Sequence, residues 1–233
     1  SYFKGKTAGG GLKLHLETRY CRAARGGTGN VKCSGNYGVC LRPLKVAKGQ
    51  GFDDNLYLEL ETYEKGALEA AVVQELSAAN VFLVLKTGEI VTPSLERGTI
   101  LPGVTRDSVL EICREFPTEI TKSLRESLAS DDATLQVVER DVTVGDFLNA
   151  TEAFVTGTAA ELVPIFSLKT GEGEEAFGVE LKYGKDVTGG PVTKAILGLL
   201  REVMAETREV GERTKNWLPD PFGSPEDFRA LKS

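Results

Sequence analysis

The chain has 233 residues, a formal net charge of −6 and a hydrophobic content of 41%. This length fits one large domain or two small ones, and the composition is that of an ordinary globular protein. The negative charge argues against a general nucleic-acid-binding surface, and no apolar run reaches the length of a membrane span. Four cysteines and a single histidine indicate neither a disulfide framework nor a histidine-based metal site.

The first 25 residues are expected to form a tail. The glycine triplet at 9–11 suggests a flexible hinge, and the alternation in residues 12–16 predicts a short strand with His15 at the surface. A central domain is expected over residues 26–214. Three prolines follow Trp217, so residues 215–233 are expected to form an extended arm.

A glycine-rich stretch, residues 26–38, carries a lysine and shows no hydrophobic periodicity. Glycine allows backbone conformations that are closed to other residues, so the backbone around Lys32 is suited to present its amine. Asn36 is placed to cap the helix that follows. In isolation the pattern also fits a lysine in a solvent-exposed loop, so the functional interpretation depends on other strings in the chain.

The remaining elements alternate between helices and strands, which predicts a mixed α/β fold. A helix is expected over 37–48, although Pro43 would kink its interior. Amphipathic helices are expected after residue 104 and over 118–129, and the longest helix over 191–213. The other predicted elements are a strand at 55–60, a hairpin over 72–93, strands at 135–139 and 153–164, and a short helix at 144–150.

Three strings together resemble branched-chain amino acid aminotransferases, which are fold type IV pyridoxal phosphate enzymes. They are Gly-Gly-Thr-Gly-Asn-Val-Lys-Cys-Ser-Gly-Asn-Tyr at 26–37, Glu-Leu-Ser-Ala-Ala-Asn-Val-Phe at 75–82 and Ile-Leu-Pro-Gly-Val-Thr-Arg at 100–106. The resemblance covers most of residues 20–200 and implies that family's large pseudo-barrel domain, with mixed sheets flanked by helices. The family's small N-terminal domain is expected to be missing, with residues 1–25 as a remnant of the interdomain connection.

The resemblance assigns roles in pyridoxal 5'-phosphate binding to the matching positions. It implies that Lys32 joins the cofactor covalently and moves protons as the catalytic residue. Tyr37, five residues later, would bond the ring oxygen, and Glu75 would keep the ring nitrogen protonated. The family usually has threonine three residues after this glutamate, where this chain has Ala78, so one hydroxyl near the ring is lost.

A second group of positions is expected to hold the phosphate and the substrate. The backbone N–H groups of Val104 and Thr105, at a helix N-terminus, would bind the phosphate together with the Thr158 hydroxyl. The amides of Thr158 and Ala159 would receive the substrate carboxylate. Some relatives carry a Cys-x-x-Cys redox pair after these residues, but residues 160–163 lack it, so no thiol switch is expected.

The resemblance therefore implies pyridoxal phosphate-dependent transfer of an amino group between a branched-chain amino acid and 2-oxoglutarate. The alternative is a catalytically degenerate domain that serves as a structural subunit of a larger assembly. The retained Lys32, Tyr37 and Glu75 favour the enzyme, whereas the missing domain and Ala78 favour the structural subunit. Related lyase and D-amino acid aminotransferase chemistries match the Gly-Gly-Thr-Gly string less well.

The same resemblance sets the expected partners and compartment. Small amino acid and 2-oxo acid substrates are expected, together with either further copies of the chain or a larger protein complex. No nucleic acid, membrane span or metal is expected. The compartment implied is the mitochondrion or the cytoplasm.

Overall fold

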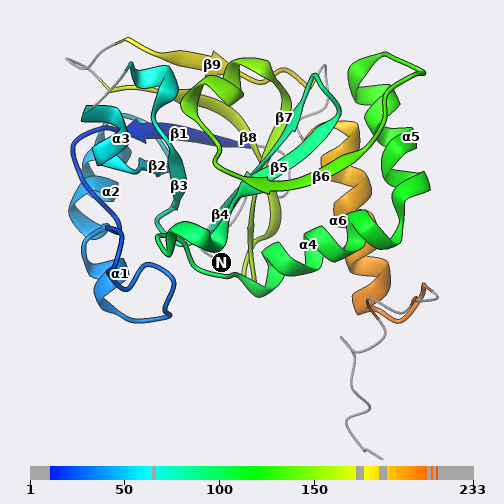
Figure 1. Ribbon diagram of the computed structural model, residues 1–233, viewed down its shortest axis with the longest axis horizontal. Coiled ribbons are helices and arrows are strands. Elements are labelled where there is room, and N and C mark those ends of the chain that lie inside the picture. The colour runs from blue at the N-terminus through cyan, green and yellow to red at the C-terminus, as the bar shows by residue number, and fades with distance from the viewer. Residues whose placement is uncertain are drawn as a thin grey trace, which may run out of the picture.

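The computed structural model describes residues 11–64, 67–171, 176–183, 188–208, 211 and 214. Within them, strands pair into one mixed sheet in the order β3-β2-β1-β8-β7-β4-β5-β6, and β9 pairs with β8. The sheet curls into a half-barrel, with α1, α2 and α3 at one end and α4, α5 and α6 at the other (Figure 1). The predicted mixed α/β fold is therefore confirmed. The strands are β1 (Leu12–Glu17), β2 (Asp54–Leu58), β3 (Val73–Leu76), β4 (Asn80–Leu85), β5 (Glu89–Pro93), β6 (Gln136–Arg140), β7 (Ala150–Gly157), β8 (Glu161–Lys169) and β9 (Gly178–Glu180).

The helices begin and end where the sequence supplies the appropriate residues. Pro117 opens α5, a position where its missing N–H costs nothing, and Pro191 does the same for α6. After α5 the chain turns through Ala129 in a left-handed conformation. None of the helices in the described ranges is both long and apolar enough to cross a membrane. The helices are α1 (Gly35–Gly38), α2 (Leu41–Gly49), α3 (Leu60–Glu64), α4 (Val104–Glu115), α5 (Pro117–Leu128) and α6 (Pro191–Met204), with 3₁₀ turns η1 (Leu68–Ala70), η2 (Leu95–Arg97) and η3 (Val144–Asn149).

Two hydrophobic clusters hold the sheet between its helices. Because neighbouring residues of a strand face opposite sides, β4 contributes Val81 and Leu83 to the cluster inside the curl and Phe82 to the cluster under α4, α5 and α6. Phe82 stacks on Phe154 of β7, with ring centres 5.2 Å apart. The strand is therefore buried on both faces and forms a rigid base for the segments attached to its ends.

The helix predicted over 37–48 is divided into two helices. The residue before α2 is Cys40, so Pro43 lies in the first turn of α2 rather than in a helix interior. The first N–H groups of a helix have no intrahelical partner, and proline therefore loses no hydrogen bond there. The predicted kink at Pro43 is wrong for this reason.

Strand β1 is confirmed as a strand, but its environment differs from the prediction. It lies between β2 and β8 and runs parallel to both, so both of its edges are paired. Its side chains are buried on both faces, with Lys13 as the exception. His15 is consequently 1% exposed, and its Nδ1 lies 2.8 Å from Oδ1 of Asn55. The predicted surface position of His15 is wrong. Residues 1–10 and the predicted arm at 215–233 lie outside the described residues, and α6 ends at Met204 rather than near 213.

Candidate active site

A pocket of about 350 Å³ lies at one edge of the sheet, where four connecting segments meet. Two of them are named here: the lysine loop, residues 18–34 between β1 and α1, and the anion loop, residues 98–103 between η2 and α4. The β3–β4 and β7–β8 turns complete the rim. Of the residues predicted for the site, Ala159 does not line the pocket and is exposed in the β7–β8 turn. The predicted residues that line it are Lys32, Tyr37, Glu75, Val104, Thr105 and Thr158.

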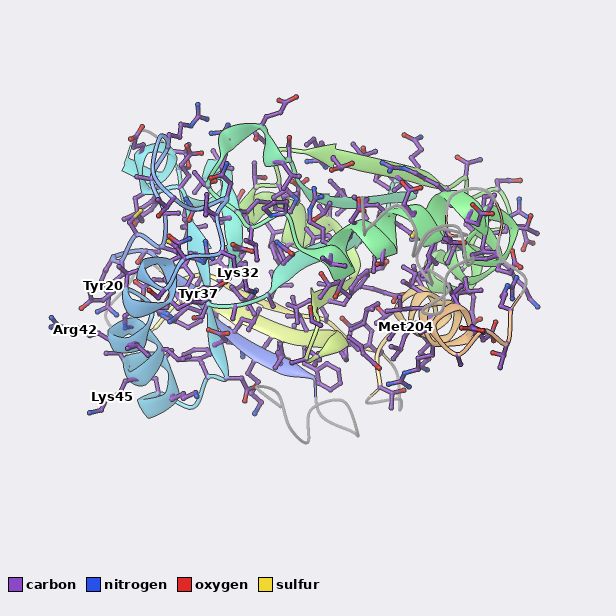
Figure 2. All side chains as sticks on the ribbon, turned by 90° about the horizontal axis from the view of Figure 1, so that it is seen from below. Tyr20, Lys32, Tyr37, Arg42, Lys45 and Met204 are labelled. Atoms are coloured by element: carbon purple, nitrogen blue, oxygen red, sulfur yellow. The ribbon has the colours of Figure 1, made fainter. Side chains whose placement is uncertain are left out.

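The Lys32 amine lies beside the Tyr37 ring. Its Nζ is 5.6 Å from the ring centre, within the range of a cation–π attraction. The two side chains lie together in Figure 2, whereas Arg42 and Lys45 of α2 point outward from the molecule. Lys32 is itself exposed, so the amine is positioned next to the phenol while it still reaches solvent.

Asn36 braces the lysine loop instead of capping a helix. Its Nδ2 donates to the carbonyl oxygens of Thr28 at 2.6 Å and Val31 at 2.8 Å, and its Oδ1 accepts from Thr28 Oγ1 at 2.8 Å. The residue before α1 is Ser34, so the predicted capping role of Asn36 is wrong. The buried Asn36 side chain adds hydrogen bonds to two carbonyl groups that lie in turns, where each also accepts one backbone N–H, and this fixes the loop that carries Lys32.

Two glycines allow the pocket segments to approach closely. A Cβ atom at Gly29 would stand 2.6 Å from the carbonyl oxygen of Thr99, so the lysine loop touches the anion loop there. A Cβ atom at Gly103 would stand 2.2 Å from Asn80 Oδ1. Both distances are shorter than real Cβ contacts, so a larger residue at either position would force its neighbour to move.

Glu75 of β3 is a buried carboxylate with defined partners. It is 2% exposed. Its Oε1 accepts hydrogen bonds from the Leu101 backbone N–H at 2.9 Å and from Arg22 Nη2 at 2.7 Å. Burial raises the pKa of Glu75 to about 7, although the positive charge of Arg22 acts to lower it. The carboxyl group is therefore fixed in position and titrates near neutral pH.

Sequence reasoning missed two residues that hold this carboxylate. Arg22 is 4% exposed and lies 53 positions before Glu75, so no local signal connects the two. Asn80 belongs to the Glu-x-x-x-x-Asn string and could have been found there. Its Nδ2 donates to Glu75 Oε2 at 2.7 Å and to the Leu101 carbonyl at 2.9 Å. Glu75 Oε2 accepts this bond from Asn80, and a carboxylate oxygen has room for a second donor.

The N-terminus of α4 offers hydrogen-bond donors at the same pocket. Val104 and Thr105 are its first two residues, and no side chain caps this end. The first N–H groups of a helix are unpaired and carry the positive end of its dipole, which suits an anion. Thr158 adds an exposed hydroxyl from the β7–β8 turn. An amine, a phenol, an acid and an anion-binding helix end in one pocket fit a phosphorylated aromatic aldehyde such as pyridoxal phosphate.

Comparison with known proteins agrees with this arrangement. The family model for amino-transferase class IV matches residues 7–168. The chain is 36% identical over 187 residues to branched-chain-amino-acid aminotransferase 5, chloroplastic, of Arabidopsis thaliana, covering 78% of this chain and 38% of that protein. It is 34% identical over 209 residues to branched-chain-amino-acid aminotransferase 1, mitochondrial, of the same plant, covering 90% of this chain and 46% of that protein.

A solved aminotransferase structure shares the fold of this chain. The branched-chain amino acid aminotransferase of Thermobaculum terrenum, in its PLP form, superposes with a TM-score of 0.61 and 26% sequence identity. The superposition covers 91% of this chain and 56% of that one. The chain thus spans less than half the length of the two plant relatives.

Proposed function

The chain belongs to the amino-transferase class IV family, and on this premise we propose that it binds pyridoxal 5'-phosphate and transfers an amino group between a branched-chain amino acid and 2-oxoglutarate. The observation that carries the proposal is the single pocket lined by Lys32, Tyr37, Glu75 and the first residues of α4. Residues 26–214, proposed as the cofactor-binding part, supply all these groups. The choice of a branched-chain substrate rests on the names of the relatives above.

Lys32 has two tasks in this proposal. Its amine would hold the cofactor covalently, and as a free base the same amine would accept a proton from the substrate α-carbon. The cofactor, when bound, supplies an electron-poor ring that stabilises negative charge on that carbon. Tyr37 lies beside the amine and would donate its hydroxyl hydrogen to the ring oxygen, orienting the ring for proton transfer.

Glu75 would hold the proton on the ring nitrogen. A carboxylate beside a pyridinium nitrogen favours the protonated ring, and that charge makes the ring a better electron acceptor. Arg22, 2.7 Å from the carboxyl oxygen, favours the ionised form of Glu75 that this task needs. The buried position excludes water and strengthens both interactions.

The anion-binding groups would hold the phosphate of the cofactor and the carboxylate of the substrate. The phosphate would be bound by the backbone N–H groups of Val104 and Thr105 and by the hydroxyl of Thr158. These contacts would hold the cofactor in place. The amides of Thr158 and Ala159 would receive the substrate carboxylate, as the resemblance implies.

An absorbance titration with pyridoxal phosphate tests the proposal. We expect the wild-type chain to develop a visible absorption band that borohydride bleaches, leaving a pyridoxyl group on Lys32 in peptide mass spectra. The variant Lys32→Ala should lose the band, whereas Lys45→Ala should keep it, because Lys45 points outward from α2 (Figure 2). A wild-type chain that stays colourless contradicts the proposal and favours the alternative, a structural subunit without chemistry.

The oligomeric state and the compartment belong to the same proposal. We propose a homo-oligomer or a place in a larger complex, because Val31, Val39 and Leu41 near the pocket are 53%, 51% and 69% exposed. Light scattering of the purified chain measures this directly, and a monomer at micromolar concentration would contradict the homo-oligomer. A mitochondrial or cytoplasmic location is proposed from the mitochondrial relative, and fractionation of the source cells tests it.

A further inference from the structure

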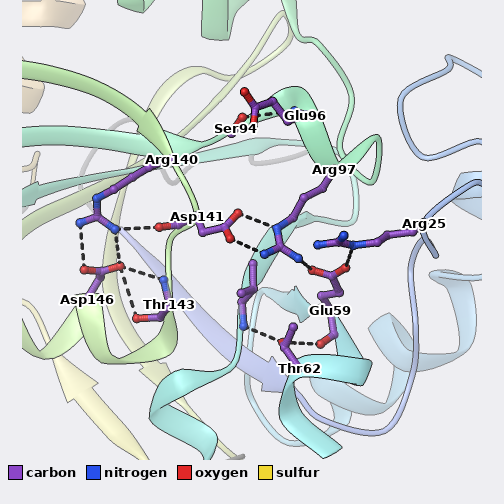
Figure 3. A network of polar contacts seen from close by, with 11 residues as sticks. Arg25, Glu59, Thr62, Ser94, Glu96, Arg97, Arg140, Asp141, Thr143 and Asp146 are labelled. Atoms are coloured by element: carbon purple, nitrogen blue, oxygen red, sulfur yellow. Dashed lines mark hydrogen bonds and ion pairs between the residues drawn. The ribbon is translucent and has the colours of Figure 1, made fainter. Parts of the chain in front are cut away.

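Glu59 contacts the lysine loop and the residue that directly precedes the anion loop. It follows β2 directly, is 4% exposed and is anchored through its own backbone, whose N–H donates to the Val72 carbonyl at 2.8 Å. Its Oε1 accepts from Arg25 Nε and its Oε2 accepts from Arg97 Nη1. Figure 3 shows the carboxylate between the two guanidinium groups. Each oxygen thus binds a different segment of the chain.

Each of the two arginines precedes a residue of the pocket by the same number of positions in the sequence. Arg25 lies in the lysine loop, seven residues before Lys32, and Arg97 ends η2, seven residues before Val104. The chain continues from Arg25 to Lys32 and from Arg97 to the N-terminus of α4. A shift of either arginine therefore displaces one half of the candidate site relative to the other half.

Arg97 is fixed from a second side as well. Its Nε donates to Asp141 Oδ1 at 2.5 Å, and its Nη2 forms an ion pair with Asp141 Oδ2. The ion pair lowers the pKa of Asp141 and raises that of Arg97. Asp141 follows β6, so the anion loop is tied to the sheet through Arg97, and Glu59 extends this tie to the lysine loop. The lysine loop has a further contact to the anion loop, where Arg22 Nη1 donates to the Thr99 carbonyl at 3.4 Å.

We propose that Glu59 is a positioning residue that sets the distance between Lys32 and the α4 N-terminus by holding Arg25 and Arg97 together. It does not line the pocket. A ligand that must reach both the amine and the anion-binding helix end depends on this distance, whereas a ligand that uses only one of them does not. Charge-assisted bonds of a nearly buried carboxylate are strong enough for such a role.

Amide hydrogen exchange in the absence of ligand tests whether Glu59 holds Arg25 and Arg97 together. We expect Glu59→Gln to accelerate amide hydrogen exchange by about tenfold or more at Val31, in the lysine loop, and at Leu101, in the anion loop. Exchange at Phe116, which ends α4, should change little. Arg25→Met removes only the first contact and should accelerate Val31 alone. Arg25 is half-exposed, so this second variant leaves the fold intact.

Asp146→Asn is the matched control. Asp146 pairs with Arg140 at 2.9 and 3.0 Å and accepts from the Thr143 N–H at 2.8 Å, so it also fixes a turn through an arginine (Figure 3). It contacts neither named loop, and its variant should leave exchange at Val31 and Leu101 unchanged. The inference is overturned if Glu59→Gln leaves either amide unchanged, or accelerates Phe116 to the same extent.

A binding measurement, which rests on the proposed function, extends the test to the site. We expect Glu59→Gln to weaken pyridoxal phosphate binding by about tenfold and inorganic phosphate binding by less than about twofold, because only the former bridges both loops. Equal losses of affinity for pyridoxal phosphate and for inorganic phosphate would contradict the positioning role of Glu59. A wild-type chain that fails to bind pyridoxal phosphate overturns the proposed function alone, since the exchange experiment still decides the role of Glu59.

Discussion

Glu75 determines the electrostatics of the pocket at the scale of a single residue. It is almost fully buried, yet it accepts bonds from Arg22, Asn80 and the Leu101 backbone. A buried carboxylate is costly when charged and stable only when its partners are retained. The family string identified Glu75 from the sequence alone, but Arg22 could not be identified, because the contact depends on how β1 is placed in the sheet.

The raised pKa of Glu75 has a consequence for stability that can be measured. A folded-state pKa of about 7, against an ordinary value of 4.5, means that the folded chain keeps this proton to higher pH than the unfolded chain. The stabilisation from Glu75 is therefore complete below about pH 4.5 and is lost as the pH rises to 7. The loss is on the order of 3 kcal/mol.

Urea unfolding at several pH values measures this effect. The free energy of unfolding of the wild-type chain should fall between about pH 5 and pH 7 more steeply than that of Glu75→Gln. Asp54, whose pKa burial raises to about 6, contributes in the same direction but is present in both chains. Parallel pH profiles for the two proteins would show that Glu75 does not titrate in this range.

At the scale of elements, the turns and loops that join β3, β4, β7 and α4 position the site. Gly103 ends the anion loop and packs against Asn80 at the start of β4. The contact places the α4 N-terminus directly beside the Asn80–Glu75 hydrogen bond. The backbone φ of Gly103 is −71°, which any residue can adopt. Glycine is therefore favoured here because space is lacking, and not because of the backbone conformation.

Gly103→Ala should damage both the fold and the site. The new methyl group must displace Asn80, so we expect a loss of about 1–3 kcal/mol in the free energy of unfolding and weaker pyridoxal phosphate binding. Gly198→Ala is the control, because a Cβ atom there meets nothing within 4 Å in the middle of α6. That change should stabilise the chain by up to about 1 kcal/mol. Thermal unfolding of the two variants measures these changes in stability. A Gly103→Ala variant as stable as the wild-type chain would exclude the close contact between Gly103 and Asn80.

The elements also show what the sequence could and could not predict. The amphipathic helix predicted after residue 104 is confirmed as α4, in which Val109, Leu110, Ile112 and Cys113 are buried, because a surface helix has one buried stripe. The burial of His15 could not be predicted, since a short alternating strand looks the same at an edge and in the middle of a sheet. Asn36 was assigned to a helix cap because its competing loop carbonyls become close only after folding.

At the scale of the whole molecule, the curled sheet brings distant segments to one edge. β1 pairs in parallel with β2 and β8, so the lysine loop that follows β1 lies at the same edge as the end of β2, and Glu59 directly follows β2. The three family strings implied this convergence, but the bridge of Glu59 to Arg25 and Arg97 had no sequence signal. Long-range ion pairs depend on the topology and not on local patterns.

A crystal structure of the chain soaked with pyridoxal phosphate shows directly whether the four groups meet around one ring. The proposed site predicts continuous density from Lys32 Nζ to the ring, the ring nitrogen within hydrogen-bonding distance of Glu75, and the phosphate at the N–H groups of Val104 and Thr105. A ring bound elsewhere, or a phosphate away from the α4 N-terminus with Lys32 unmodified, would contradict it.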